Sequence, residues 1–76
     1  MPKVKQFADC RIAVNPRDHR PAHVHVEFRD GDRCTVEIVS LKVVGSVRPT
    51  SKLRQALEWI ADNRESLLAL WKEIVQ

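Results

Sequence analysis

Residues 23–38 read HVHVEFRDGDRCTVEI, with apolar and polar residues alternating on both sides of Arg29-Asp30-Gly31. A period of two is typical of β-strands that bury one face, and Asp followed by Gly is a frequent turn signal. We therefore predict an antiparallel hairpin whose strands are residues 23–28 and residues 32–38.

The length of the hairpin loop follows from the pairing that each loop produces. A two-residue loop, Asp30-Gly31, would place apolar residues opposite polar ones on both faces of the hairpin. A three-residue loop, with Gly31 in the left-handed conformation that closes a bulged turn, gathers the apolar residues on one face. The predicted pairs are Val26–Cys34 and Val24–Val36 on that face, and Glu27–Arg33, His25–Thr35 and His23–Glu37 on the other.

Weaker strand patterns flank the hairpin. Residues 10–14 alternate apolar residues with polar or small ones, which favours another strand, and Asn15-Pro16 ends it because proline has no N–H to donate to a ladder. Residues 4–7 and 41–44 are short extended candidates. The sequence thus predicts a small, mainly antiparallel sheet of three to four strands.

The last third of the chain has the period of an α-helix instead. Its apolar residues step by three and four, and they are Leu53, Leu57, Ile60, Leu67, Trp71 and Ile74. Arg64 interrupts this stripe, so we predict two helices, residues 51–62 and 64–75, with Thr50 and Asn63 as their N-caps. One kinked helix is the alternative.

These elements predict a single α+β domain over residues 1–76, because a chain this short supports only one small core. Helices that carry one apolar stripe can cover one face of a sheet, and we expect both to pack on the apolar face of the hairpin. The opposite face then stays exposed to solvent and carries His23, His25 and Glu27.

The charge and the apolar content limit the compartments in which the protein is expected and the classes of partner that it is expected to bind. Thirteen Lys and Arg against ten Asp and Glu give a net charge of +3, but the excess is scattered and only weakly favours a nucleic-acid partner. No apolar run approaches the roughly 20 residues needed to cross a bilayer. The first residues also lack the apolar stretch of a secretory signal. We therefore expect a cytoplasmic protein with no membrane partner.

The two cysteines, Cys10 and Cys34, both lie in alternating apolar patterns. A reducing cytoplasm argues against a disulfide between them. We expect both to be buried and unbridged, as small apolar side chains.

The candidate site lies in residues 18–26, DHRPAHVHV, which hold all three histidines of the chain. Because side chains alternate along a strand, His23 and His25 project from one face, and His19 approaches from the preceding loop. Metal binding is one interpretation, since imidazole is the commonest protein ligand for zinc. The spacing lacks the Cys-x-x-Cys and His-Glu-x-x-His patterns, so we predict no cofactor. A divalent metal such as zinc on His19, His23 and His25 is the alternative.

A second interpretation uses imidazole as acid and base. A metal-independent ribonuclease needs one group that removes the proton of the 2'-hydroxyl and another that protonates the leaving oxygen. His23 and His25 are the candidate catalytic pair, with His19 in support. The candidate binding residues around the pair are Asp18, Arg20, Arg33 and Glu37, with Arg11 as a further phosphate ligand.

A structural interpretation competes with both. His23 opposite Glu37 is then a cross-strand ion pair, His25 is a surface residue of a strand, and His19 is a turn residue that bonds to the backbone. The residues alone do not decide among the three interpretations.

The segment Asp18-His19-x-Pro21-x-His23-Val24-His25-Val26 resembles the signature of a small bacterial family, domain of unknown function 4160. The likeness extends along most of the chain, through Met1-Pro2-x-Val4, Phe7, Leu53, Leu57, Asn63, Leu67 and Trp71. The chain differs from the usual pattern at Ala22, where members commonly have a second proline, and at residues 12–14, where they have aromatic residues.

This resemblance implies a compact bacterial protein that is often encoded beside another small protein, as toxin–antitoxin components are. We therefore expect a toxin–antitoxin-type component that binds or acts on RNA through its histidine face, with the small protein from the adjacent gene as its partner. A non-enzymatic interaction module, antitoxin-like or homodimerising, is the main alternative, and a metal-binding protein is the third.

Overall fold

The computed structural model describes residues 3–75 and consists of one sheet followed by helical segments. Met1 and Pro2, which carry part of the family resemblance, lie outside the described residues. The strands are β1 (Lys3–Gln6), β2 (Cys10–Ala13), β3 (His23–Phe28), β4 (Arg33–Glu37) and β5 (Val43–Ser46). They are followed by the 3-10 helix η1 (Thr50–Leu53), then α1 (Arg54–Asp62) and α2 (Arg64–Ile74).

The five strands form one antiparallel sheet in the order β1-β2-β3-β4-β5. The predicted α+β class is confirmed, whereas the predicted count of three to four strands is wrong. Both weak candidates are real strands of four residues each, and they form the two edges of the sheet. The second of them begins two residues later than predicted, at Val43, and includes Gly45.

The predicted register of the β3–β4 hairpin is confirmed in every pair. Gly31 has a φ of 100°, the left-handed conformation that the three-residue loop requires. The turn is closed by two backbone hydrogen bonds, from the N–H of Phe28 to the carbonyl of Asp32 at 2.8 Å and from the N–H of Gly31 to the carbonyl of Phe28 at 3.1 Å.

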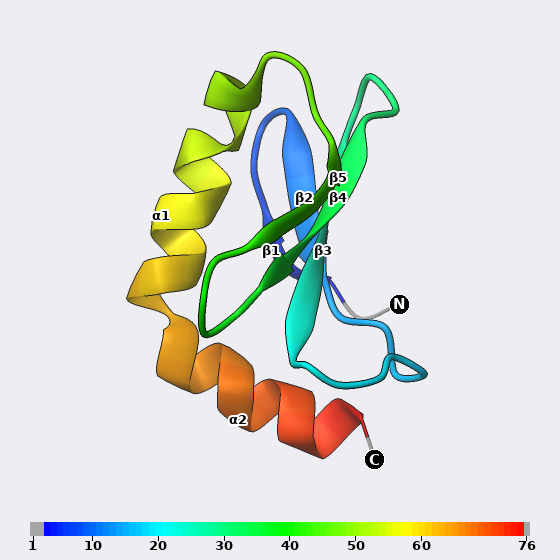
Figure 1. The fold of residues 1–76 in the computed structure, drawn as a ribbon, viewed down its shortest axis with the longest axis vertical. Helices are drawn as coiled ribbons and strands as arrows, with labels where there is room; N and C mark the ends of the chain where they lie inside the picture. The colour runs from blue at the N-terminus through cyan, green and yellow to red at the C-terminus, as the bar shows by residue number, and fades with distance from the viewer. Residues whose placement is uncertain (1–2, 76) are drawn as a thin grey trace.

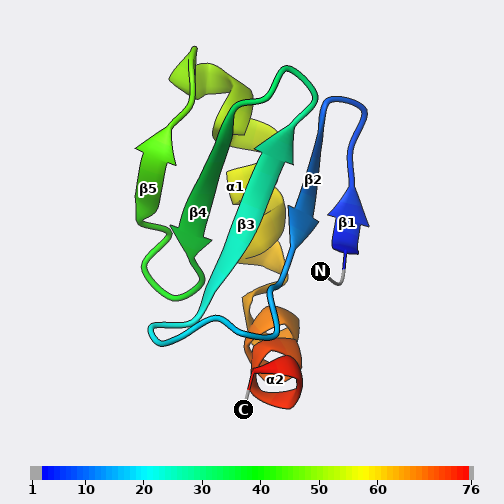
Figure 2. The same cartoon turned by 90° about the vertical axis from the view of Figure 1, so that its right-hand side faces the viewer.

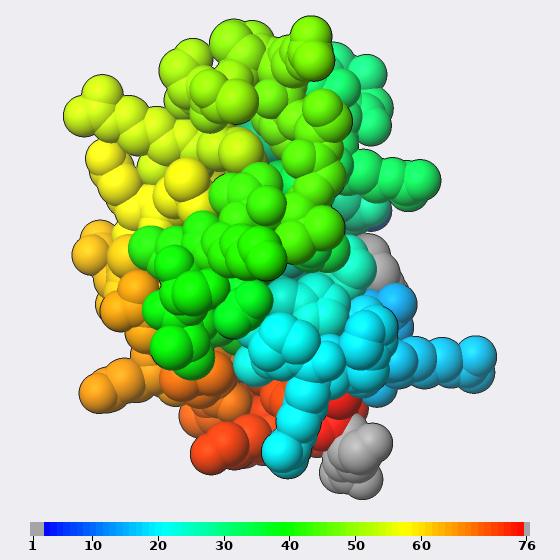
Figure 3. Space-filling view, viewed as in Figure 1, coloured from blue at the N-terminus to red at the C-terminus, as the bar shows by residue number. Residues whose placement is uncertain are grey.

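The sheet and α1 form two layers around the core. In Figure 1 the helices lie on one side of the sheet, and in Figure 2 α1 lies behind the strands while α2 continues past their lower end. The buried residues of the hairpin, Val24, Val26 and Val36, pack in one cluster with Ala56 and Ile60 of α1. In the space-filling view, side chains of the green β4–β5 segment fill the space beside the yellow and orange helices (Figure 3).

The junction between the helices differs from the predicted capping. Asn63 stands at the N-cap position of α2 without a side-chain cap bond; its Nδ2 instead donates to the carbonyl of Trp59 at 2.8 Å and so caps the end of α1. Thr50 is not an N-cap, because η1 already includes it. Arg64, which interrupts the apolar stripe, donates from Nε to the carbonyl of Ile38, 3.0 Å away, just beyond β4.

Within residues 3–75, no helix combines the length and the apolar character that a membrane crossing demands.

Candidate functional site

The face of the sheet opposite α1 carries the predicted site, and we call it the bare face (Figure 2). The strand register arranges its side chains in rows that run across the strands. The rows are Arg11–Glu27–Arg33, then Ala13–His25–Thr35–Val44, then His23–Glu37.

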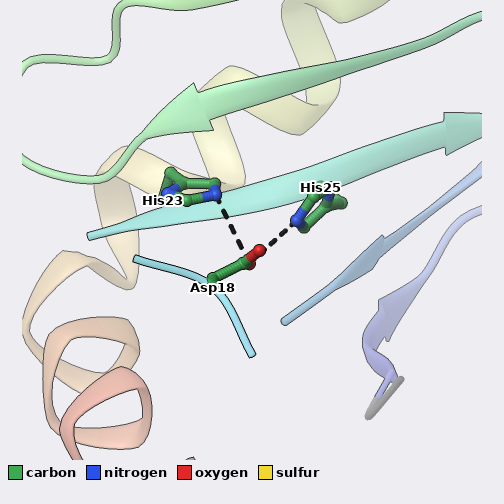
Figure 4. Close-up of side chains that lie close together, drawn as sticks. All are labelled: Asp18, His23 and His25. Atoms are coloured by element: carbon green, nitrogen blue, oxygen red, sulfur yellow. Dashed lines mark hydrogen bonds and ion pairs between the residues drawn. The ribbon is translucent and has the colours of Figure 1, made fainter. Parts of the chain in front are cut away.

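Asp18 joins the two histidines of β3. Its Oδ2 lies 2.8 Å from Nε2 of His25 and 3.3 Å from Nε2 of His23. Figure 4 shows both rings projecting from β3, with the carboxylate of Asp18 between them on a separate segment. The two histidines therefore share one carboxylate oxygen.

A local turn brings Asp18 to this position. The side chain of Asn15 accepts a hydrogen bond from the N–H of Arg17 at 3.0 Å, and its carbonyl accepts one from the N–H of Asp18 at 3.1 Å. Such bonds are the usual role of asparagine in turns. They fold the connection between β2 and β3 back toward the strand that follows it.

His23 has a second partner. Its Nδ1 lies 2.8 Å from the carbonyl oxygen of Pro21, and since a carbonyl only accepts, Nδ1 carries a hydrogen in this contact. Both nitrogens of His23 are therefore engaged by the protein. His25 uses only Nε2 among the described residues.

The three side chains are partly shielded but remain on the bare face. The exposed fraction is 11% for Asp18, 14% for His23 and 24% for His25. His19 is exposed, and its ring lies edge-on to that of His23 with 6.1 Å between the centroids. The expectation that His23 and His25 project from the same face, away from the helices, is met by this geometry.

Other predicted site residues have different neighbours from those expected. Glu37 stands opposite His23 in the register, but the ion pair of His23 is with Asp18. Glu27 likewise pairs with Arg11, whose Nε lies 3.0 Å from Oε1, and not with Arg33. The expected cross-strand ion pairs are thus replaced by partners from the connection and from β2.

Arg20 lines a hollow that none of the histidines lines and whose other lining residues include Leu68, Trp71 and Lys72 of α2. Arg29, which no sequence pattern indicated, lines the same hollow as Arg11 and Arg33. It lies in a turn, where no periodic pattern indicates the direction of a side chain.

Shallow hollows connect the histidines to the arginines along the bare face. The hollow beside Asp18 and His23 shares His25, Thr35 and Val44 with a second one. The second hollow shares Glu27 and Arg33 with a third, which also contains Arg11 and Arg29. We call these three adjoining hollows, from Asp18 to Arg29, the groove.

The two ends of the groove differ in charge. At the arginine end Glu27 pairs with Arg11, whereas no carboxylate of residues 3–75 forms an ion pair with Arg29 or Arg33. Asp32 also lines this end, but Lys52 pairs with it, so Arg29 and Arg33 give this end an excess of positive charge. The opposite end holds the Asp18–His23–His25 cluster.

Cys10 also lines the arginine end but is not a candidate nucleophile. Burial, together with the nearby Asp9 carboxylate, raises the pKa of the Cys10 thiol to about 11, so the thiol is protonated at neutral pH. Cys34 is buried as well, and both cysteines are unbridged, as predicted.

The cluster permits two kinds of chemistry. Asp18 orients His25 through Nε2, which leaves Nδ1 of His25 as a proton acceptor, the arrangement of a general base. Alternatively, Asp18, His23 and His25 offer one ligand atom each, all within 4.8 Å of one another, to a metal ion.

The comparisons with known proteins agree with the sequence resemblance. The model of the family described as "Domain of unknown function (DUF4160)" matches residues 10–72, which is most of the chain. No curated protein and no solved structure gave a match.

Proposed function

Because the chain belongs to the DUF4160 family, whose description names no activity, we propose its function from the geometry of its bare face. The protein is a toxin–antitoxin-type component of the cytoplasm that binds RNA along the groove. The observation that carries this proposal is that the three hollows of the groove adjoin one another, with the histidine cluster at one end and, at the other, Arg29 and Arg33, which have no ion-pair partner among residues 3–75.

Arginine recognises phosphate through paired N–H donors, so several arginines around one hollow favour a phosphate-rich ligand such as RNA. Arg11 and Arg33 stand on β2 and β4, on either side of Glu27 in β3. Arg29 follows at the end of β3. Three guanidinium groups thus border one hollow, two of them without a carboxylate partner in the described range.

Among residues 3–75, the large aromatic residues on which bases usually stack lie in or against the core, and Phe28, which lines the arginine end of the groove, is only 7% exposed. Phe28 and Trp71 are buried in the core, and Trp59 packs against it from α1. Affinity should therefore come mainly from the phosphates. Such binding is strongly salt-dependent and has little base preference.

An RNA bound along the arginine end extends toward His25 and Asp18. The candidate residues for action on a phosphodiester are His23, His25 and His19, and Glu37 borders the same hollow. The small protein from the adjacent gene, as antitoxin, would cover this face.

The first experiment measures growth during expression of the protein. We expect expression to arrest growth, and the paired substitution His23→Ala and His25→Ala to abolish the arrest while the fold survives. Unaffected growth at high expression would contradict the toxin assignment.

The second experiment measures RNA binding by fluorescence anisotropy with a labelled single-stranded oligoribonucleotide. Arg29→Ala combined with Arg33→Ala should weaken binding at least about tenfold, because two charged phosphate contacts are lost. Arg54→Ala is the control, since Arg54 lies on α1 and removes a charge outside the groove. Equal affinity of all these variants would overturn the groove as the binding surface.

The edge of the sheet favours a non-enzymatic interaction module as the second candidate. Within the described sheet β5 pairs with β4 alone, so the outer edge of β5 is available to another strand. Val44, a residue of β5, is 58% exposed. A complex with the adjacent gene's product, or a homodimer, that persists in the His23→Ala, His25→Ala variant would favour this candidate.

A further inference from the structure

We propose that Asp18, His23 and His25 bind one divalent transition-metal ion, such as zinc. This inference names a cofactor for the histidine end of the groove. It does not depend on RNA binding, since its evidence is the contacts of these three side chains alone.

The hydrogen-bond donors of His23 provide the first argument. Nδ1 donates to the carbonyl of Pro21 at 2.8 Å, and Nε2 faces the carboxylate oxygen of Asp18 at 3.3 Å. Carbonyl and carboxylate oxygens only accept, while a neutral imidazole has one N–H. In the neutral ring, Nε2 and Oδ2 therefore face each other with lone pairs. A cation between them uses both lone pairs and removes the conflict.

The positions of the ligand atoms provide the second argument. Zinc binds imidazole nitrogen at about 2.0–2.1 Å and carboxylate oxygen at about 2.0–2.2 Å, so two ligands of a tetrahedral ion stand roughly 3.3 Å apart. Oδ2 of Asp18 lies 3.3 Å from Nε2 of His23 and 2.8 Å from Nε2 of His25. A tetrahedral site requires the second contact to open by about half an ångström and the ring nitrogens of His23 and His25, which lie within 4.8 Å of each other, to stand about 3.3 Å apart.

The contact with Pro21 provides the third argument. Histidines that bind metals commonly donate their other N–H to a backbone carbonyl, which fixes the ring and leaves the remaining nitrogen as the ligand. The Pro21 carbonyl has this relation to His23, and it holds Nε2 toward Asp18 and His25. β3 and the turn at Asn15 therefore position the ligands before any ion binds.

The donor set indicates the class of metal. Two imidazoles and one carboxylate suit zinc, iron(II), nickel or copper, whereas calcium and magnesium prefer oxygen ligands. Three protein ligands leave at least one coordination position for water or for an oxygen of a bound phosphate. Because the cluster lies at one end of the groove, such a position is next to the proposed path of the RNA.

His19 provides the matched control. It was the third ligand of the metal site considered from the sequence, but the structure groups Asp18, and not His19, with the two strand histidines. His19 is exposed and contacts His23 only edge-on. We therefore expect His19→Gln to leave metal affinity unchanged, although it removes an imidazole next to the site.

The test is a calorimetric zinc titration of untagged protein that has been stripped of metal with EDTA, in the absence of RNA. We expect one zinc per chain. Second-shell changes already cost about 10–100-fold in metal affinity, so Asp18→Asn, His23→Gln and His25→Gln should each cost about 100-fold or more. Cobalt(II) absorption provides a second readout of the ligand set, and thermal unfolding with and without zinc shows which variants are folded.

Wild-type protein that binds no zinc would overturn the proposal, as would full affinity in Asp18→Asn or equal losses in His19→Gln and His23→Gln. The cluster would then be a hydrogen-bonded clamp with hydrogens on the ring nitrogens that face Asp18. Asp18→Asn is nearly isosteric, so it keeps the test decisive if a histidine variant fails to fold. The RNA measurement is made in buffer with EDTA, so failure of the metal site and failure of RNA binding are distinguishable.

Discussion

The Nζ atom of Lys52 lies 2.6 Å from Oδ2 of Asp30, which ties the start of the helical half of the chain to the β3–β4 turn. The same ammonium lies 2.8 Å from Oδ2 of Asp32 and sits over the ring of Phe28, 4.6 Å from its centroid. Asp32 also accepts a hydrogen bond from the N–H of Arg48. The contacts fix η1 against the hairpin, so they position α1 behind the sheet.

The ion pairs of Lys52 with Asp30 and Asp32, which we call the lysine clamp, predict a pH dependence of stability. Hydrogen bonds from Lys52 lower the pKa of both Asp30 and Asp32 below 3.8, and the two carboxylates raise the pKa of Lys52 above 10.5. A carboxyl whose pKa is lower in the folded than in the unfolded state stabilises the fold at pH values above its unfolded-state pKa. This stabilisation is lost as the pH falls through its folded-state pKa. A lysine whose pKa is higher in the folded than in the unfolded state stabilises the fold at pH values below its unfolded-state pKa. This stabilisation is lost as the pH rises through its folded-state pKa.

Lys52→Met should therefore lower the free energy of unfolding at pH 7 and lessen the further loss between pH 7 and pH 3. Urea unfolding at both pH values measures this. Arg54→Met, which removes an exposed cation two residues away, is the control and should keep the wild-type dependence. A variant of Lys52 that loses stability in acid as steeply as the wild type would contradict the lysine clamp.

A second prediction concerns Gly45, whose φ is 120°. A Cβ at Gly45 would lie 3.1 Å from both Cα and Cβ of Cys34. Gly45→Ala should therefore cost more than the roughly 1–3 kcal/mol of backbone strain alone. Gly31→Ala is the matched control, since Gly31 also has a positive φ but a Cβ there meets no atom within 4 Å. Equal losses of unfolding free energy in the two variants would show that the contact with Cys34 does not matter.

The hairpin could be predicted residue by residue because two physical constraints coincide in it. The period-two pattern selects the faces, and Gly31 provides the left-handed residue that sets the loop length. In β5 the pattern is weak, since an edge strand needs few apolar residues, and the predicted extended stretch ended before Gly45. The position of that strand is set by close packing on Cys34, which no periodicity reveals.

The candidate site was predictable only in its strand residues. Alternation places His23 and His25 on one face, whereas the position of Asp18 depends on the turn at Asn15 and on the path of an irregular connection. Asp18 is adjacent to His19 in sequence, yet it contacts the two strand histidines. Residues in irregular segments follow no periodic pattern from which their tertiary contacts could be predicted. Arg29 could not be predicted for the same reason.

A third prediction concerns the thiols. Burial raises the pKa of both Cys10 and Cys34, that of Cys10 to about 11, and the two side chains are 3% and 5% exposed. The thiolate is the reactive form, so both should react slowly with a disulfide reagent such as DTNB at pH 8 in the native protein. In 8 M urea both thiols should react as fast as a free thiol in solution. Rapid labelling of one thiol per native chain would show that this part of the core opens readily.

The last prediction follows from a groove that binds RNA through phosphates. Each phosphate neutralised on a single strand contributes about 0.7 to the slope of log affinity against log salt concentration. If Arg29 and Arg33, which have no carboxylate partner among residues 3–75, each contact one phosphate, their double alanine variant should reduce that slope by about 1.4. Arg11→Ala should reduce it less, because Glu27 already neutralises the Arg11 side chain. Anisotropy titrations at several salt concentrations measure the slopes, with Arg54→Ala as a control that removes one positive charge outside the groove. An unchanged slope in the double variant, together with weaker binding, would mean that these arginines shape the groove without contacting phosphate.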